Sequence, residues 1–447
     1  MTTLTLTIVF VFVAGYVCIA AESFTKVNKA AVALLMCVLC WTLYMTDPGQ
    51  YLSQAMSGTA GTWHELVTQA GESLKIHLGD TAETLFFLMG AMTIVEVVDT
   101  YGGFNFVRDI MKTRSKRKLL WRIAFMTFFL SAILDNLTTS IVMIMVLRKL
   151  IRDNKERMIF ASIVIIAANA GGAFSPIGDV TTIMLWIKGM ITTGGVLSGL
   201  FLPSVVSLLI PVLILQFSLK GKLDSGQNLP QSNVSPFTRR QRHIVFFLGV
   251  GGLIVVPVFR YFTNLPPFMG ILLVLGLLWM VTEFFYRSAS EDDTMARRVS
   301  HLMSRIDMST ILFFLGILMA VACLSEIGVL TALGTTLFNL SGGNHYLVTG
   351  TIGVISSIVD NVPLVAGCMG MYPIAPVGDM AVDGLFWQLL AYCAGVGGSM
   401  LIIGSAAGVV VMGLEKITFG WYLKHISWVA LVGYLAGMVT YWLVRMI

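Results

Sequence analysis

The chain has 447 residues, of which 56% are hydrophobic and only 12% are charged, and its mean hydropathy is +0.84. Soluble domains carry about 25% charged residues, so the composition excludes an ordinary soluble domain and predicts a protein surrounded by membrane lipid. The net charge of +5 does not indicate a nucleic-acid partner, because the basic residues lie in short clusters between apolar segments.

Apolar segments of spanning length follow one another along the chain. The first lacks the basic start of a signal peptide, so we expect it to be retained as a span. No CxxC or Cys/His spacing indicates a metal site, and we expect no cofactor. We predict an all-α polytopic membrane protein with about ten spans, near residues 3–21, 28–46, 80–99, 158–188, 194–219, 243–260, 266–286, 307–327, 387–413 and 426–446.

Loop charge predicts how these spans are oriented. Positive charge is concentrated in the loops on the cytoplasmic side of membrane proteins. We therefore place six loops inside and both termini outside. These six loops hold 25 of the 29 Lys and Arg residues, and they are 22–29, 100–122, 148–157, 220–242, 287–305 and 414–424.

Two further apolar segments, 119–149 and 347–376, do not fit as single spans. The first has basic residues at both ends and should begin and end inside, whereas the second has none and should begin and end outside. We predict two re-entrant hairpins that enter from opposite faces, with Asp135-Asn136 and Asp360-Asn361 at their tips. Irregular backbone at this depth is allowed where protein or a water-filled cavity covers it.

The two halves of the chain repeat at a nearly constant offset. The Asp-Asn pair at 135 recurs at 360, and the glycines at 171, 172 and 178 recur at 397, 398 and 404. The loop charges make the span at 80–99 run inward and the span at 307–327 run outward, so the repeats are inverted. Inverted repeats with interrupted helices place substrate and coupling ions near the midplane of the membrane, at the repeat interface.

This repeat divides the chain into four parts. Residues 1–79 form N-terminal spans and an external loop, and residues 220–306 form linker loops and two spans. Residues 80–219 form the first repeat, with hairpin 119–149 and interrupted helix 158–188. Residues 307–447 form the second repeat, with hairpin 347–376 and interrupted helix 387–413.

The stretch 167–182, AANAGGAFSPIGDVTT, predicts a break in the first interrupted helix, because its glycines and proline disfavour a continuous helix. A break frees backbone carbonyls and half-helix ends to coordinate a cation, and hard cations prefer oxygen ligands. The second interrupted helix offers Ser399 and Ser405 but no carboxylate. The first offers five oxygen-bearing side chains around its break, Asn169, Ser175, Asp179, Thr181 and Thr182.

Asp135, Asp179 and Asp360 are the candidate buried acids. A carboxylate in the bilayer costs roughly 3 kcal/mol, so such residues mark ion paths. Loss of solvent favours the protonated form of a carboxyl group, so a proton competes with a cation for the same site. A site that holds either ion and faces each side of the membrane in turn predicts an antiporter.

Structural roles remain open for the same side chains. Asp135 and Asp360 are also typical hairpin caps, and Asp179 is a candidate N-cap of the second half-helix. An Asn at a hairpin tip either forms the turn or coordinates the ion through its amide. A Thr either coordinates the ion or donates a hydrogen bond back to the backbone of its own helix. These alternatives apply to Asn136, Thr138, Thr139 and Asn361.

Acids near the ends of the spans are weaker candidates. Glu83 and Glu96 are candidates for a proton path, although Glu96 equally suits the cytoplasmic mouth. Glu326 and Glu415 lie near span ends, and we expect them at the membrane interface.

The motifs LDNLTTS at 134–140, AANAGGAFSPIGDVTT at 167–182 and VDNVPLV at 359–365 resemble NhaD-type sodium/proton antiporters. These belong to the ion transporter superfamily, which includes dicarboxylate/sodium symporters. The resemblance implies efflux of Na⁺ or Li⁺ in exchange for protons, in a bacterial inner membrane and commonly by a homodimer. By matching position, it implies ion-site roles for Asp135, Asn169, Asp179, Thr181, Thr182, Asp360 and Asn361. The predicted Na⁺ ligands are Asp135, Asn136, Asp179, Asp360 and Asn361.

Two other functions use some of the same residues. A sodium-coupled symporter of small carboxylates fits the architecture, but symporters of this kind typically carry Ser-Asn-Thr at the hairpin tips. Here an aspartate precedes each tip asparagine, and fixed negative charge repels an anion. An intramembrane aspartyl protease using Asp135 and Asp179 would need a Gly-x-Gly-Asp motif, whereas residues 176–179 read Pro-Ile-Gly-Asp.

Overall fold

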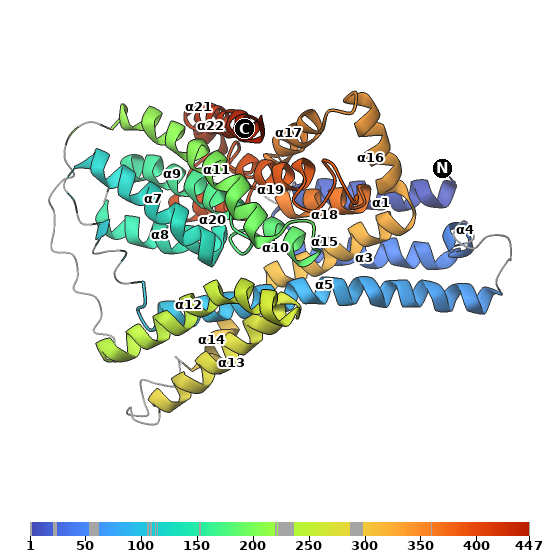
Figure 1. The fold of residues 1–447 in the computed structure, drawn as a ribbon, viewed down its shortest axis with the longest axis horizontal. Helices are drawn as coiled ribbons and strands as arrows, with labels where there is room; N and C mark the ends of the chain where they lie inside the picture. Colours follow the sequence, from blue (N-terminus) through green and yellow to red (C-terminus); the bar gives the residue numbers. More distant parts are fainter. Residues whose placement is uncertain are drawn as a thin grey trace. The chain divides into compact units, whose positions relative to one another are not determined.

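The computed structural model describes residues 2–20, 25–52, 62–104, 107, 110, 111, 113, 115–151, 153–219, 221, 237–286, 298–358 and 360–446. The regular elements assigned within these ranges are helices, which confirms the all-α prediction (Figure 1). Among the described residues, eight helices are long and apolar enough to cross a membrane: α3, α5, α9, α11, α12, α13, α15 and α22.

The helices follow the predicted spans closely. From the N-terminus they are α1 (Thr3–Ala20), α3 (Lys29–Thr46), α4 (Gly49–Leu52), α5 (Trp63–Thr100), α7 (Lys116–Leu134), α8 (Asn136–Leu150), α9 (Asn154–Ala173), α10 (Val180–Ile187), α11 (Thr193–Gln216), α12 (Arg239–Thr263) and α13 (Pro267–Tyr286). The second half contains α14 (Val299–Leu302), a 3₁₀ turn (Met303–Arg305), α15 (Met308–Glu326), α16 (Val329–Leu340), α17 (His345–Ser356), α18 (Asn361–Met371), α19 (Leu385–Gly397), α20 (Ala406–Glu415), α21 (Phe419–His425) and α22 (Ser427–Met446).

Both predicted hairpins and both predicted helix breaks are present as helix pairs. Asp135 alone separates α7 from α8, and residues 357–360 separate α17 from α18. The first interrupted helix consists of α9 and α10, and the second consists of α19 and α20. Apart from α7 and α9, the pieces of these motifs are too short to cross a membrane by themselves.

Two of the longer helices differ from the prediction, and the short helices α4, α14 and α21 also lie outside the predicted elements. α5 begins at Trp63 and not near residue 80, and its 38 residues are too long for one span. Its first part is polar, so hydropathy does not detect it, but Ala, Leu, Glu and Lys in this part favour a helix. The second difference is α16, which begins after Gly328, a residue with a positive φ of 73°. No predicted element covers α16.

The chain divides into two compact units, and each draws on several segments. Residues 1–88, 307–348 and 362–374 form the first unit, in which α3 packs closely on α15. A Cβ on Gly316 would lie 2.6 Å from the backbone of Ala33, so only glycine permits this approach. In the same unit, the indole of Trp41 donates to the carbonyl of Met319 at 2.8 Å, and His77 pairs with Glu326 at 2.8 Å.

Residues 89–306, 349–361 and 375–447 form the second unit. Here α7, α8 and α9 lie side by side, and α12 and α13 form an adjacent antiparallel pair (Figure 1). The helices that follow the two interrupted helices, α11 and α22, pack against each other over a long interface. A Cβ on Gly437 would lie 2.7 Å from the carbonyl oxygen of Pro203, so the α11 and α22 backbones approach closely.

Contacts within the second unit show that the two interrupted helices run in opposite directions. Arg157 at the start of α9 contacts Glu415 at the end of α20. At the other ends, Asp383 before α19 accepts hydrogen bonds from Thr192, which follows α10. The two breaks meet between these points, where a Cβ on Gly395 would lie 3.1 Å from the Ala173 side chain. The interrupted helices are therefore antiparallel, as the inverted repeat requires.

Candidate cation site

Asp135 connects the two helices of the first hairpin in an unusual backbone conformation. Its φ is +85° and its ψ is 159°, a region that residues with a side chain rarely adopt. One carboxylate oxygen accepts from the Thr138 amide at 2.7 Å, and the other accepts from the Thr138 hydroxyl at 2.8 Å. Asp135 therefore caps the start of α8, as its predicted structural role required.

The first helix break comprises Phe174–Asp179 and lies directly against the first hairpin. A Cβ on Gly178 would lie 2.7 Å from the carbonyl oxygen of Ser131, so glycine is required for this approach. The Ser131 hydroxyl donates to the carbonyl of Ala168 at 2.6 Å. The Ser175 hydroxyl donates to the carbonyl of Ala132 at 2.5 Å. These two serines therefore satisfy carbonyls at the hairpin and near the break.

The second break repeats this arrangement with the equivalent residues. A Cβ on Gly404 would lie 2.5 Å from the carbonyl oxygen of Ser357. The Ser356 hydroxyl donates to the carbonyl of Ala394 at 2.9 Å, which matches the Ser131 bond. Neither Ser131 nor Ser356 was predicted as a site residue, although the two are separated by the same offset as the two Asp-Asn pairs.

The half-helices α10 and α20 begin in the same way but with different chemistry. Asp179 is the N-cap of α10, with φ −146° and ψ 146°, and accepts from the Thr181 amide at 3.1 Å. Ser405 is the N-cap of α20, with φ −146° and ψ 153°, and accepts from the Gly408 amide at 3.2 Å. The repeat thus places a carboxylate at one half-helix and a neutral hydroxyl at the other.

Asp179 is the point at which the two repeats meet. It is only 1% exposed, and both hairpin tips donate to its carboxylate. The Asn136 amide donates to Oδ2 at 2.9 Å, and the Asn361 amide lies 3.4 Å from Oδ1 and 3.3 Å from Oδ2. The N-terminus of α10 adds a favourable dipole for negative charge.

Asn169 on α9 links this carboxylate to the second break. Its Oδ1 accepts from Asn136 at 3.0 Å, and its Nδ2 donates to Ser399 at 2.9 Å and to Ser405 at 3.0 Å. Asn169 is fully buried, and each of its partners is at most 5% exposed. A continuous buried network therefore joins six of the predicted residues: Asn136, Asn169, Asp179, Asn361, Ser399 and Ser405.

Other predicted residues lie around this network with different roles. The Thr182 hydroxyl donates to the carbonyl of Asp179 at 2.8 Å, a bond within its own helix turn. The buried hydroxyls of Thr139 and Thr181 have no hydrogen-bond partner among the described residues. Asp360 precedes Asn361 and is half-buried, so its partial exposure contrasts with the burial of Asp179.

The two candidate proton-path residues lie apart from each other along α5. Glu96 belongs to the second unit, is paired with Arg305 at 3.4 Å and keeps 32% of its side chain exposed. Glu83 is half-buried and belongs to the first unit. Within the described part of the chain, no group of three or more His, Cys, Asp and Glu residues is arranged to hold a metal ion. A cation at the network would therefore rely on amide, hydroxyl and backbone oxygens beside one carboxylate.

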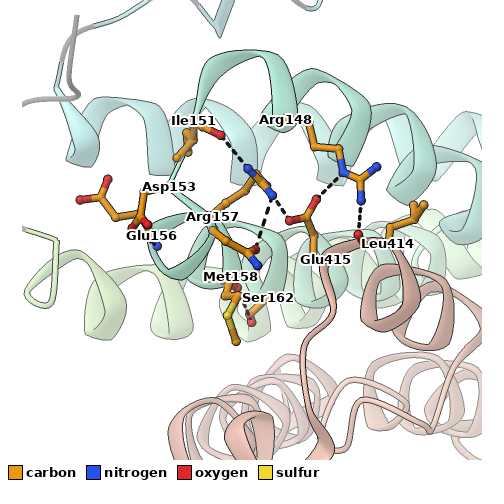
Figure 2. Close-up of polar contacts among 10 residues, drawn as sticks. Arg148, Ile151, Asp153, Glu156, Arg157, Met158, Ser162, Leu414 and Glu415 are labelled. Carbon is orange, nitrogen blue, oxygen red and sulfur yellow. Dashed lines mark hydrogen bonds and ion pairs between the residues drawn. The ribbon is translucent and has the colours of Figure 1, made fainter. Parts of the chain in front are cut away.

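The same unit contains an acid, Glu415, for which the sequence predicts only a position at the membrane interface. The side chain of Glu415 is fully buried and contacts two arginines, Arg148 and Arg157 (Figure 2). Its position at the end of a short apolar helix suggested an interfacial residue. Burial became evident only from the packing of α20 on α8 and α9.

Comparison with known proteins agrees with this architecture. A family model described as "Citrate transporter" matches residues 16–391. The chain is 44% identical over 428 residues to sodium/proton antiporter 1 of Arabidopsis thaliana, covering 96% of this chain and 70% of that protein. It is 31% identical to the Na⁺/H⁺ antiporter NhaD of Vibrio cholerae, covering 97% of this chain and 91% of that protein.

The fold also matches a solved structure. The YdaH transporter of Alcanivorax borkumensis has a TM-score of 0.60 and 13% identity, over 92% of this chain and 97% of that chain. At this identity the match concerns the fold alone. The family model and the relatives identify a transporter and not an intramembrane protease. The chain belongs to the citrate-transporter family and, within it, to the NhaD-type sodium/proton antiporters.

Proposed function

We propose that the protein exchanges Na⁺, or Li⁺, for H⁺ by alternating access, with Asp179 binding either ion. The observation that carries this proposal is the convergence of both hairpin amides on one buried carboxylate. Asn136 and Asn361 belong to opposite repeats, so a change at Asp179 affects both repeats at once. A site shared by the repeats is what alternating access around a fixed position needs.

The chemistry follows from the two forms of the carboxyl group. When Asp179 is ionised, its charge attracts a cation, and the Asn amides can rotate to present their carbonyl oxygens to that cation. When Asp179 is protonated, the charge that attracts the cation is lost. Burial disfavours the state in which Asp179 binds neither ion, because an uncompensated charge in this environment is costly. The two ions therefore compete for one site.

The relatives support Na⁺ and H⁺ as the exchanged ions. Proteins named sodium/proton antiporters match nearly the whole chain. We propose a bacterial inner membrane and a homodimer, as the resemblance of the hairpin motifs implies. The inward-facing basic loops are consistent with this placement.

Symport of Na⁺ with a small carboxylate is the second candidate, because the matching family model is described as a citrate transporter. The site does not favour this activity. The groups that donate to the Asp179 carboxylate are amides, and an ionised Asp179 would repel a carboxylate substrate.

Everted membrane vesicles distinguish the two candidates. Respiration acidifies their interior, and a pH-sensitive dye reports whether added Na⁺, Li⁺ or K⁺ dissipates that gradient. We expect dissipation with Na⁺ or Li⁺ and no Na⁺-dependent citrate uptake. Citrate uptake without any cation-induced proton movement would contradict antiport.

A further inference from the structure

Glu415 forms a buried ion cluster at the end of α20 that lies away from Ser405. Its Oε1 accepts from Nε of Arg148 at 2.8 Å, and its Oε2 accepts from Nε of Arg157 at 2.5 Å. Figure 2 shows the carboxylate between the two guanidinium groups. The side chain of Glu415 is 0% exposed, whereas Arg157 is 15% and Arg148 is 44% exposed.

The cluster joins three helices from both repeats. Arg148 lies near the end of α8, Arg157 near the start of α9, and Glu415 at the end of α20. Arg148 also donates from Nη2 to the carbonyl of Leu414, so it contacts the α20 backbone as well. Arg157 is fixed in turn by the Ile151 carbonyl at 2.9 Å. The cluster thus holds α20 at a defined position along α8 and α9.

α20 is a short helical connection between this cluster and the cation site. It has ten residues, Ala406–Glu415, and its N-cap is Ser405. At 1.5 Å per residue, its length is about 15 Å. A helix transmits a displacement at one end to the other, so movement of Glu415 along α8 and α9 would displace Ser405 from Asn169. Asn169 in turn contacts Asn136, which donates to Asp179.

We propose that Glu415, held by Arg148 and Arg157, is a positioning residue for the cation site. It acts through α20 by keeping Ser405 in hydrogen-bond contact with Asn169. The inference rests on the proposed Na⁺/H⁺ exchange, because Na⁺ dependence is the property that it predicts. The cluster does not contact the ion and does not exchange protons with it.

The other half-helix has a corresponding support. Arg260 of α12 donates from Nη1 to the carbonyl of Trp186 at 2.5 Å, and Nη2 lies 3.4 Å from that of Ile187. Its guanidinium also lies over the Trp186 ring, 4.7 Å from the centroid. An arginine therefore caps the last carbonyls of α10 as Arg148 caps those of α20. In both repeats, therefore, an arginine holds the C-terminal end of the half-helix, which is the end away from the cation site.

Glu415→Gln tests the proposal with little change in shape. Glutamine keeps one acceptor oxygen, but its NH₂ group cannot accept from an arginine, so one of the two arginine contacts is lost together with the negative charge. We expect the Na⁺ concentration for half-maximal exchange to rise by about tenfold, as for other residues that orient a metal-binding shell. The maximal rate should stay near that of the wild type, because Asp179 is intact. Ser405→Ala should also raise the Na⁺ concentration for half-maximal exchange, because it removes the contact with Asn169 directly.

A double-variant cycle separates positioning from general destabilisation. If Glu415 acts through Ser405, adding Ser405→Ala to Glu415→Gln should have little further effect. The half-maximal Na⁺ concentration of the double variant should differ from that of Glu415→Gln by less than about twofold. The matched control is Glu156→Gln, which breaks the Lys116–Glu156 pair between α7 and α9 and does not involve α20, and it should leave Na⁺ dependence unchanged. If Glu415→Gln does not accumulate, Arg148→Lys provides the same test, because it keeps the charge but cannot bridge Glu415 and Leu414.

Two results would overturn the proposal. One is wild-type Na⁺ dependence in Glu415→Gln within an active, well-inserted protein. The other concerns the double variant. If its half-maximal Na⁺ concentration rises by the product of the factors for Ser405→Ala and Glu415→Gln, the two residues act separately. Failure of the proposed function looks different, because the wild type itself would then show no response to Na⁺.

Discussion

Asp179 and Ser405 occupy equivalent positions in the two repeats, and the difference between them decides where charge lies. Both residues cap a half-helix with nearly the same backbone angles. Asn169 on α9 corresponds to Gly395 on α19, so the second interrupted helix has neither the carboxylate nor the amide found at the equivalent positions of the first. The second break supplies Ser399 and Ser405 to Asn169 instead. The described residues therefore form one composite site with one buried carboxylate.

Asp179→Asn should abolish exchange while the protein still inserts into the membrane. The amide keeps the shape of the side chain but removes the charge that attracts the cation and the group that takes up the proton. The measurement is Na⁺-induced dissipation of the pH gradient in everted vesicles, normalised to transporter content. As a control, Glu96→Gln should retain exchange, because Glu96 is partly exposed and pairs with Arg305. Normal exchange by Asp179→Asn would reduce Asp179 to a helix cap.

Substitutions of Asp135 should change the stability of the protein according to whether they keep the cap of α8. Asn tolerates positive φ and can still accept the Thr138 amide bond, so Asp135→Asn should unfold at nearly the wild-type temperature. Asp135→Ala loses both bonds to Thr138 and keeps the strained φ, which should lower stability by about 1–2 kcal/mol. Thermal unfolding of the purified protein in detergent compares the two variants. Equal melting temperatures for the Ala and Asn variants would show that the cap does not stabilise the hairpin.

At the scale of the helices, the two breaks depend on glycines that let backbones approach. Gly178 lies against the carbonyl of Ser131, and Gly404 lies against that of Ser357. Each contact fits one interrupted helix against the hairpin of its own repeat. A side chain at these positions would separate the break from the hairpin, which carries the tip asparagine.

Gly404→Ala should therefore destabilise the protein by about 1–3 kcal/mol and reduce exchange, because its Cβ would lie 2.5 Å from the Ser357 oxygen. Gly413→Ala on α20 is the matched control, since nothing lies within 4 Å of a Cβ there. That substitution should leave exchange unchanged and increase helix stability slightly. Melting temperatures and exchange rates of the two variants provide the comparison. A Gly404→Ala protein as stable as Gly413→Ala would contradict the close approach.

Across the whole molecule, hydropathy and charge predicted the elements better than they predicted contacts. The Asp-Asn pairs, the glycine clusters and their common offset predicted both hairpins and both breaks, because these features depend on local backbone chemistry. The start of α5 and all of α16 escaped detection, since one is polar and the other is a short apolar segment. The bond of Asn361 to Asp179 and the burial of Glu415 depend on segments far apart in sequence, and no local pattern predicts them.

The antiparallel interrupted helices predict opposite accessibility at their ends. Lys155 lies beside the start of α9, and Val377 lies before α19 and is 78% exposed. A membrane-impermeant maleimide should label Val377→Cys in intact cells and Lys155→Cys only in everted vesicles. Background labelling is measured in the wild type, in which Cys18 is the exposed cysteine among the described residues. Labelling of both positions from one side would contradict the inverted repeat in the membrane.

Competition between Na⁺ and H⁺ at Asp179 is tested most directly by equilibrium binding of radioactive Na⁺ to the purified protein over a range of pH. The wild type should bind Na⁺ with an affinity that falls as the pH is lowered, because protonation removes the charge on the carboxylate. Asp179→Asn should show no saturable binding at any pH. Saturable Na⁺ binding by Asp179→Asn, with wild-type affinity and the same pH dependence, would place the exchange site elsewhere.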